Sequence, residues 1–361
     1  MDLTILNTDF IPQHIIDVYK SFIWTDRYSS YGDFEVYIPM SIETIRKFQQ
    51  GYYLQFGNSE HAMIIENIQI TTDVENGAFL IVTGRSLESI LLRRIVWTQT
   101  NFAANAYIQN MVSKLLNDAI ISPSIANRKI SNFVFKSSSD SRISTLRTTG
   151  ELQFTGDNLY DAIKKICDLY GLGFKITIND SAKFEFELYM GLDRSYAQSA
   201  LPYVSFSPNF DNLINSDYKV DVANYKNVTL VAGEGEGVDR KTAVVDTLGA
   251  SGLDRYELYT DARDLSTNTD SGTLTDDQYT AVLINRGRNK LTENKIESDF
   301  SAKVDYQTMY IYGRDFTMGD IVQFENEFNL QSRVRVTEFI QSDSPDNGVE
   351  QYPTFETIEE D

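Results

Sequence analysis

Residues 33–45 read DFEVYIPMSIETI. Over the first six of these positions polar and apolar side chains alternate, which predicts a β-strand with one buried face. Pro39 ends this strand, and Ser41 is a capping residue that can begin a short helix directly afterwards. The stretch therefore predicts a β-rich fold that is interrupted by short helices.

The segments that follow repeat this pattern as far as residue 96. Strands are predicted over 52–56, 63–71 and 78–84, where β-branched and aromatic residues are frequent. Ser86 can start another short helix that turns its apolar side chains inward. We interpret this part of the chain as a β module.

The pattern changes after Trp97, where apolar residues recur at helical spacing. Two amphipathic helices are predicted from the stripes Ile108, Met111, Val112, Leu115, Leu116 and Ala119, and Leu159, Ile163, Ile166, Cys167 and Tyr170. Asp157 is the expected cap of the second helix and Gly171 its expected end. The Ser- and Asp-rich residues 137–144 are expected to form a loop.

Strand character returns from Phe206, notably at residues 227–232. Thr275 and Gln278 then form a capping box, which predicts a helix through about Lys290. Further strands are predicted at 173–178, 183–189, 302–313, 320–325 and 333–340.

Together these segments predict an α+β fold, mostly β, with two β modules and two inserts. The predicted division is a first β module at 1–96 plus about 206–235, an α+β insert at 97–205, a second β module at 236–258 plus 299–361, and a helical insert at 259–298.

The charge balance excludes several classes of partner. The chain has 32 basic and 52 acidic residues, a net charge of −20. Such a surface repels phosphate backbones, so we expect no specific nucleic-acid binding; it serves solubility, or forms an acidic wall past which DNA slides. No apolar run reaches the roughly 20 residues of a membrane span, and the N-terminus does not resemble a secretory signal, so we expect a protein made in the cytoplasm.

The scarcity of cysteine and histidine argues against catalysis and metal binding. Cys167 is the sole cysteine, and the two histidines are His14 and His61. A single cysteine cannot form an intrachain disulfide or a thiolate cluster. Two histidines far apart in sequence argue against a His-rich metal site or the catalytic base of a serine hydrolase. Cys167 lies on the apolar stripe of its helix and is expected to be a buried structural residue. We expect no catalytic residues, no cofactor and no metal.

Three motifs suggest other chemistry, and each has a simpler explanation. The glycines of Gly233–Gly237 follow a predicted strand but lack dinucleotide-loop spacing and a following helix, so a turn with positive φ is expected. Carboxylate pairs such as Asp26 with Asp33, or Glu185 with Glu187, are expected by chance in so acidic a chain. The acidic run Asp270–Asp277 lacks the Gly and closing Glu of a Ca²⁺ loop.

Several segments, in order along the chain, resemble siphophage tail-associated and baseplate-hub proteins. They are Ser21–Tyr28, Gly32–Glu35 with Ile38-Pro39, Gly84–Leu91 with Arg93-Arg94, Leu230–Gly235, Gly313–Phe316 with Met318–Val322, and Arg335–Glu338. Residues 97–150 and 239–300 match no pattern of that family.

The resemblance implies an architecture and a role. Hubs of this kind are similar to the central proteins of contractile-tail baseplates. They carry two tail-tube-like β-barrels per chain and assemble as a homotrimer, so that six barrels continue the hexameric tube. Many relatives add a C-terminal enzymatic or receptor-binding domain; this chain stops at Asp361, directly after the second β module, so we expect that part to be absent.

The resemblance further implies a non-enzymatic tail-tip hub in the virion, assembled in the host cytoplasm, that closes the tube and opens it for DNA. Its expected partners are the distal tail protein, the C-terminus of the tape-measure protein, and receptor-binding or tip proteins. One alternative is a carbohydrate-binding or glycan-cleaving baseplate component, which would show a cleft of aromatic residues around two close carboxylates. A β-rich bacterial scaffold unrelated to phages is another.

Overall fold

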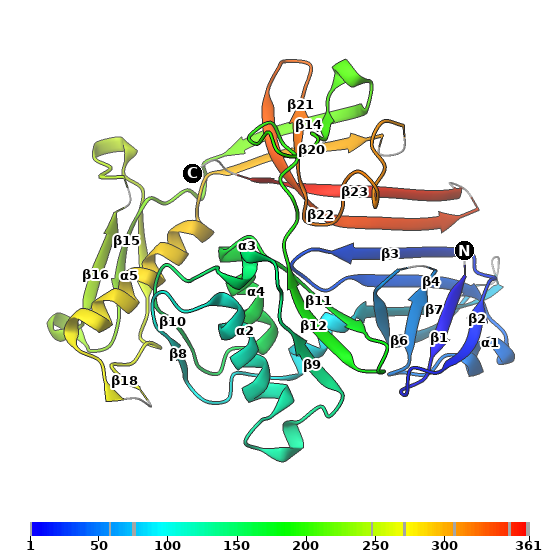
Figure 1. Cartoon of the computed structure of the whole chain (residues 1–361), viewed down its shortest axis with the longest axis horizontal. Coiled ribbons are helices and arrows are strands. Elements are labelled where there is room, and N and C mark those ends of the chain that lie inside the picture. The colour runs from blue at the N-terminus through cyan, green and yellow to red at the C-terminus, as the bar shows by residue number, and fades with distance from the viewer. Residues whose placement is uncertain are drawn as a thin grey trace.

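The computed structural model describes residues 2–57, 59–73, 77–246, 248–269, 272–305, 308–345 and 348–358. Strands account for 41% and helices for 21%, so the predicted mostly-β α+β class is confirmed. Figure 1 shows the first β module and the second insert at opposite ends, with the first insert and the second β module between them. None of the helices in the described ranges is long and apolar enough to cross a membrane.

The first β module is a strongly curled sheet. Its elements are β1 Leu3–Leu6, β2 Pro12–Ile16, β3 Ser21–Arg27, β4 Asp33–Pro39, α1 Ile42–Lys47, β5 Tyr53–Phe56, β6 Ala62–Asp73 and β7 Gly77–Ser86. The strand order is β3-β4-β7-β6-β5-β1-β2. The rings of Phe22 on β3 and Phe56 on β5 lie 4.8 Å apart although three strands separate them in the sheet. The sheet therefore wraps around its own core.

The alternation read from the sequence produces this core. Phe34, Val36 and Ile38 on β4 are buried, while Glu35 between them is exposed. Ser41 caps α1 by accepting a hydrogen bond from the backbone N–H of Thr44, as predicted. Burying one face of each strand in this way is what gives a curled sheet a hydrophobic interior.

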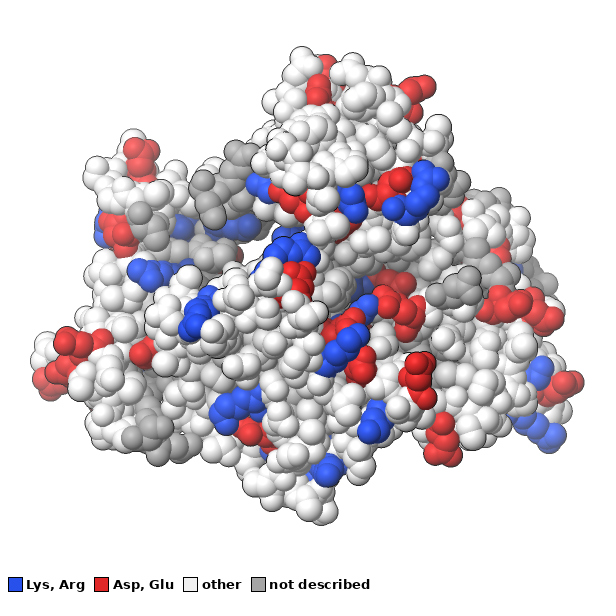
Figure 2. Space-filling model, in the orientation of Figure 1, with Lys and Arg blue, Asp and Glu red and all other residues white. Residues whose placement is uncertain are grey.

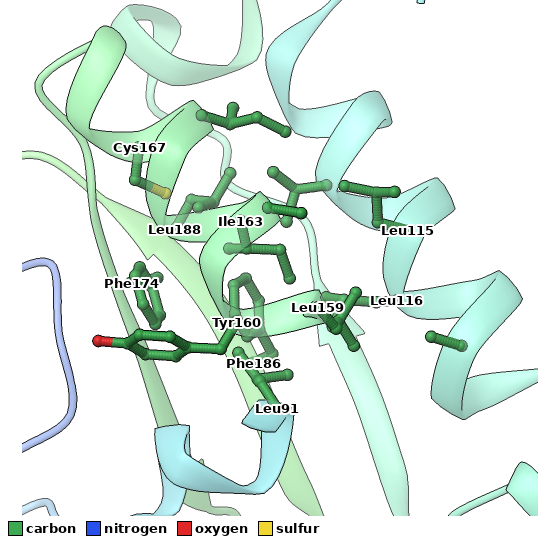
Figure 3. Close-up of a cluster of buried hydrophobic side chains, with 14 of the residues drawn as sticks. Leu91, Leu115, Leu116, Leu159, Tyr160, Ile163, Cys167, Phe174, Phe186 and Leu188 are labelled. Carbon is green, nitrogen blue, oxygen red and sulfur yellow. The ribbon is translucent and has the colours of Figure 1, made fainter. Parts of the chain in front are cut away.

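The first insert packs two helices on a small sheet. Its elements are the 3₁₀-helix η1 Leu87–Arg93, β8 Thr100–Phe102, α2 Ile108–Leu116, the π-helical turn η2 Asn117–Ile121, η3 Ala126–Arg128, β9 Phe133–Lys136, α3 Ser141–Ser144, β10 Leu152–Phe154, α4 Leu159–Leu169, β11 Gly173–Ile178 and β12 Phe184–Tyr189. Figure 3 shows side chains from η1, α2, α4, β11 and β12 converging in one cluster. Both predicted helical stripes face this core.

The second β module extends the sheet of the first. Its elements are β13 Ser205–Phe206, η4 Pro208–Phe210, β14 Leu213–Asp221, β20 Glu297–Val304, β21 Ile321–Glu325, β22 Gln331–Ser344 and β23 Gly348–Ile358. The long strand β22 pairs with β21 over residues 331–335 and with β3 over residues 338–343. One eleven-stranded sheet therefore runs through both modules, and Figure 1 shows β22 lying alongside β3.

The second insert is a three-stranded sheet with a helix on one face. Its elements are β15 Val228–Ala232, η5 Gly237–Asp239, β16 Thr242–Asp246, η6 Gly252–Asp254, β17 Glu257–Asp261, β18 Asn268–Thr269, β19 Gly272–Thr273 and α5 Asp276–Glu293. The capping box of Thr275 and Gln278 is present at the start of α5, as predicted. Gly287 on α5 lies against side chains of Val231 and Val245, so the helix sits close to the sheet.

The structure does not confirm the expected barrels. Within the described residues no sheet closes, so the two β-barrels are not confirmed. The strand β22 pairs with β3 of the other module, so the strands of the two modules share one sheet. β14 pairs with β20, and β15 pairs with β16 in the sheet next to α5; the predicted division of the chain into modules stays a prediction.

Some smaller expectations were wrong. Asn158, and not Asp157, caps α4 by accepting from the backbone N–H of Tyr160. The expected loop at 137–144 contains the short helix α3, and the expected strand at 302–313 ends at Val304. The strand β23 was missed, because its residues do not alternate clearly and include Pro353.

Candidate functional site at the junction of three modules

A cleft of about 820 Å³ lies where the first β module, the first insert and the second β module meet. We call it the junction cleft. The residues that define it here are Asp26 on β3, Glu60 and His61 before β6, Lys175 on β11, Tyr312 before β21 and Phe339 on β22. Figure 2 shows charged side chains of both signs along the line where the second β module meets the rest of the chain.

Asp26 is the carboxylate at the inner end of β3. It follows Trp24 on the buried face of the strand, and its Oδ1 accepts a hydrogen bond of 2.9 Å from the Trp24 indole N–H. Burial raises the pKa of Asp26, which is opposed by His61 and the Trp24 bond, while the charge of Glu60 raises it further. Among the described residues no ion pair joins Asp26 to a basic side chain.

A second carboxylate, Glu88, is buried behind the cleft. Its Oε1 accepts 2.6 Å from the backbone N–H of Ile176, and its other oxygen accepts from the Ser86 hydroxyl. Burial raises its pKa despite these bonds. His61 lies between acids, with Nδ1 4.0 Å from Glu88 and Nε2 4.0 Å from Glu60.

The acids at the outer side of the cleft are paired with lysines. Lys175 Nζ lies 2.7 Å from Glu60 and 3.2 Å from Glu187, and Lys136 Nζ lies 2.6 Å from Glu187 and 3.4 Å from Glu185. Burial acts to raise the pKa of Glu187, but the two lysines outweigh it and hold the pKa below its usual range. The pair Glu185 and Glu187 thus forms part of a lysine-bridged strand face.

The residues of the cleft come from segments far apart in the chain, and the fold as a whole can be compared with known proteins. A family model described as Siphovirus ReqiPepy6 Gp37-like protein matches residues 2–355. The chain belongs to this siphovirus tail protein family. The expected family resemblance is confirmed, and the protein is a phage tail component.

Solved structures share the fold of this tail protein. A tail protein from Neisseria meningitidis MC58 is 14% identical, with a TM-score of 0.57, and the match covers 99% of this chain and 96% of that one. The 43 kDa tail protein of prophage MuSo2 from Shewanella oneidensis is 11% identical, with a TM-score of 0.57 and 99% and 98% covered. Prophage tail protein gp18 from Listeria monocytogenes EGD-e is 12% identical, with a TM-score of 0.55 and 100% and 96% covered. No curated protein matches the sequence.

The other residues singled out in the sequence lie outside the cleft of this tail protein. Cys167 is buried in the core of the first insert, where burial raises the pKa of its thiol (Figure 3). His14 is exposed on β2, far from His61 in the sheet order. Asp33 forms an ion pair with Arg27, whereas the neighbouring acid whose charge acts on Asp26 is Glu60. The expected pair of Asp26 with Asp33 is therefore not part of the cleft.

The glycine-rich loop after β15 is a turn that is held in place by side-chain hydrogen bonds. Gly235 and Gly237 have φ of +102° and +55°, as expected for a turn with positive φ. The carboxylate of Glu234 accepts from the N–H and hydroxyl of Thr267, which holds the loop against the start of the β18 hairpin. In the acidic run that follows, Asp270 lies outside the described residues, and Asp276 pairs with Lys241 at 2.7 Å.

Proposed function

We propose that three copies of this chain form a hub at the tip of a siphophage tail, which joins the tail tube to the adsorption apparatus. The observation that supports this role most directly is the open eleven-stranded sheet. Three of its strands, β2, β13 and β23, each pair with a single neighbour in the described residues. An edge strand exposes unpaired backbone N–H and C=O groups, which can pair with a strand of another chain. We infer that the edges of this sheet pair with neighbouring chains in the assembled tail.

The exposed face of β2 fits such a contact. Ile15 on β2 and Ile11 just before it are 61% and 56% exposed. Large aliphatic side chains on an edge strand are a liability in an isolated molecule and are buried when subunits join. We infer that this edge contacts another subunit or a partner such as the distal tail protein, the tape-measure C-terminus, or a receptor-binding or tip protein.

The stoichiometry at the tail tip tests the proposal. Cryo-electron microscopy of the virion should show three copies of this chain around the tail axis, with the edge at β2 covered. Two or six copies at the tip would contradict a trimeric hub. Partners that can template the trimer are present on the particle, so the stoichiometry is measured there.

The proposed hub acts mechanically and has no enzymatic activity. The junction cleft does place aromatic residues near two carboxylates, as the glycan-binding alternative requires, but one aromatic ring face and one of the carboxylates are already engaged. Tyr312 stacks on Phe339 with ring centroids 3.8 Å apart, and Glu60 is tied to Lys175. Incubation of the purified protein with host cell wall should release no sugar or peptide products; release that disappears on changing Asp26 to Asn would overturn this proposal.

DNA passage sets a condition on the lumen of the assembled hub. Each lysine or arginine contact with phosphate would add salt-dependent drag, so we infer a lumen that is acidic or uncharged. The net charge of −20 supplies acids easily. A ring of unpaired basic side chains around the axis of the assembled hub would refute this inference.

A further inference from the structure

Within the described residues, Asp26 and the more exposed Asp2 are the acids lining the junction cleft that form no ion pair with a lysine or arginine. Glu60 is bound by Lys175, and Glu187 by two lysines. We propose that the junction cleft receives an arginine or lysine side chain from a segment of another protein, with the carboxylate of Asp26 as its ionic anchor.

Asp26 is half-buried on β3. A carboxylate removed from water costs free energy unless a cation or several hydrogen bonds compensate it. One bond, from the Trp24 indole, reaches Asp26 from a side chain of the described chain. An arriving guanidinium or ammonium would supply the missing charge and strong charge-assisted hydrogen bonds.

The side chains that line the cleft also favour a cation. Tyr189 and Tyr312 line it. The Lys175 ammonium already lies 5.5 Å from the Tyr189 ring centroid, and one face of Tyr312 is stacked on Phe339, so the opposite face of Tyr312 is the one that an arriving cation could contact. Asp2 at the mouth is exposed and adds negative charge, whereas Lys175 is already neutralised by its two glutamates. The field in the cleft therefore favours a positively charged group over a neutral one.

The size of the cleft identifies the kind of ligand. Its volume of about 820 Å³ falls within the roughly 300–1,000 Å³ of ordinary ligand pockets. No group of three acids, cysteines or histidines among the described residues could hold a metal ion. A side chain carried on a peptide segment fits this space better than a bare ion does.

The two tryptophans provide a direct readout. Trp24 donates to Asp26, whereas Trp97 is 60% exposed and outside the cleft, so Trp97→Phe assigns the two indole N–H signals in an NMR spectrum. The probe is the peptide acetyl-Ala-Ala-Arg-Ala-Ala-amide. Its citrulline analogue has nearly the same shape without the charge.

We expect the arginine peptide to shift the Trp24 signal saturably, and the citrulline peptide to leave it in place. Asp26→Asn should weaken the dissociation constant at least about tenfold, since a charge-assisted bond is lost. Asp9→Asn is the matched control: it removes the same charge from an exposed turn and should bind as the wild type does. Asn can still accept the Trp24 hydrogen bond, so folding is expected to survive.

Several outcomes would overturn the inference. Equal binding to Asp26→Asn and wild type would mean that the peptide is held by the general negative charge alone. A shift produced by tri-N-acetylchitotriose but not by the arginine peptide would assign the cleft to glycans. No shift with either ligand would show that the cleft is not a binding site. None of these results touches the stoichiometry on which the hub proposal rests.

Discussion

Tyr28 touches all three modules around the cleft. Its backbone N–H donates to Thr337 O at 2.9 Å in the second β module, and its carbonyl accepts from Phe174 N–H at 3.2 Å in the first insert. The Arg335 guanidinium lies 5.1 Å from its ring centroid. Gly319, with φ of +86°, brings the turn before β21 against the same ring. The packing at Tyr28 therefore fixes how the modules sit relative to one another.

Gly319→Ala should destabilise this junction. A Cβ at position 319 would meet the Tyr28 ring and would also strain a backbone of positive φ, so we expect the free energy of unfolding to fall by about 2–4 kcal/mol. Gly313 has a similar φ of +84° but open space around its Cβ, so Gly313→Ala reports the backbone strain alone. Urea unfolding of both variants separates the two effects; equal losses would show that the contact with Tyr28 is unimportant.

Residue properties that depend on near neighbours could be predicted, and those that depend on distant ones could not. The burial of Cys167 follows from the helical stripe around it, and the positive φ of Gly235 from its glycine-rich context. Asp26 and Glu60 are brought together by the curling of the sheet. Nothing in the local pattern of either residue signals the other.

At the scale of elements, Glu88 joins the first β module to the first insert. The N–H of Gly32 donates to the Ser86 hydroxyl at 2.8 Å, that hydroxyl donates to Glu88, and Glu88 accepts from Ile176 on β11. A buried hydrogen-bonded carboxylate holds elements together but disfavours its own ionised form. The link is therefore sensitive to pH.

Glu88→Gln should remove a pH dependence of stability. Because burial raises the folded-state pKa of Glu88 above its usual 4.5, its stabilising effect is complete below that pH and is lost as pH rises through the folded pKa. Gln is uncharged, its Oε1 can accept from the Ile176 N–H, and its amide nitrogen can donate to the Ser86 oxygen in place of accepting from it. We therefore expect the Glu88→Gln variant to have a free energy of unfolding about 1–3 kcal/mol higher than the wild type at pH 7. The measurement is urea unfolding at pH 4 and pH 7; a difference that is equal at both would contradict the argument.

The matching control is Glu88→Ala, which leaves the Ser86 hydroxyl and the Ile176 N–H without their partner. We expect it to lower the free energy of unfolding by about 1–3 kcal/mol. Asp26, whose pKa is also raised, contributes a pH dependence of the same sign, which is common to both variants and cancels in the comparison.

Elements with strong local signals were predicted well, and long strands were not. The capping box correctly predicted where α5 starts, and the alternation in β4 correctly predicted which face of the strand is buried. The strand β22 looks like a short strand in sequence but continues to Ser344, because β3 and β23 pair along it. Pairing partners decide the length of such a strand, and they lie outside its own sequence.

At the scale of the whole molecule, the long strand β22 decides the architecture. Its pairing with β3 joins residues about three hundred positions apart, such as Arg27 and Glu338, which also form a 2.6 Å ion pair. The alternation of strand-rich and helical segments along the chain could be predicted from periodicity. The single sheet could not, because the expected closed barrels and an open sheet have the same strand pattern along the chain.

The open sheet and the net charge of −20 act in opposite directions on assembly. Subunits that join through apolar strand edges gain burial and backbone hydrogen bonds that salt hardly affects. Their like charges repel over distances set by the Debye length, roughly 30 Å at 10 mM and 8 Å at 150 mM salt. Repulsion between three such chains is therefore strongest in dilute buffer.

We expect the proposed trimer to be favoured by salt. Raising sodium chloride from about 10 to about 150 mM should increase the trimeric fraction several-fold, because the repulsion is screened while the contact at β2 is kept. Native mass spectrometry is unsuited to high salt, so sedimentation velocity is the measurement. Ile15→Lys, which puts a charge on the exposed face of β2, should lower the trimeric fraction at every salt concentration. Dissociation as salt rises would show that ion pairs, and not apolar edges, hold the subunits together.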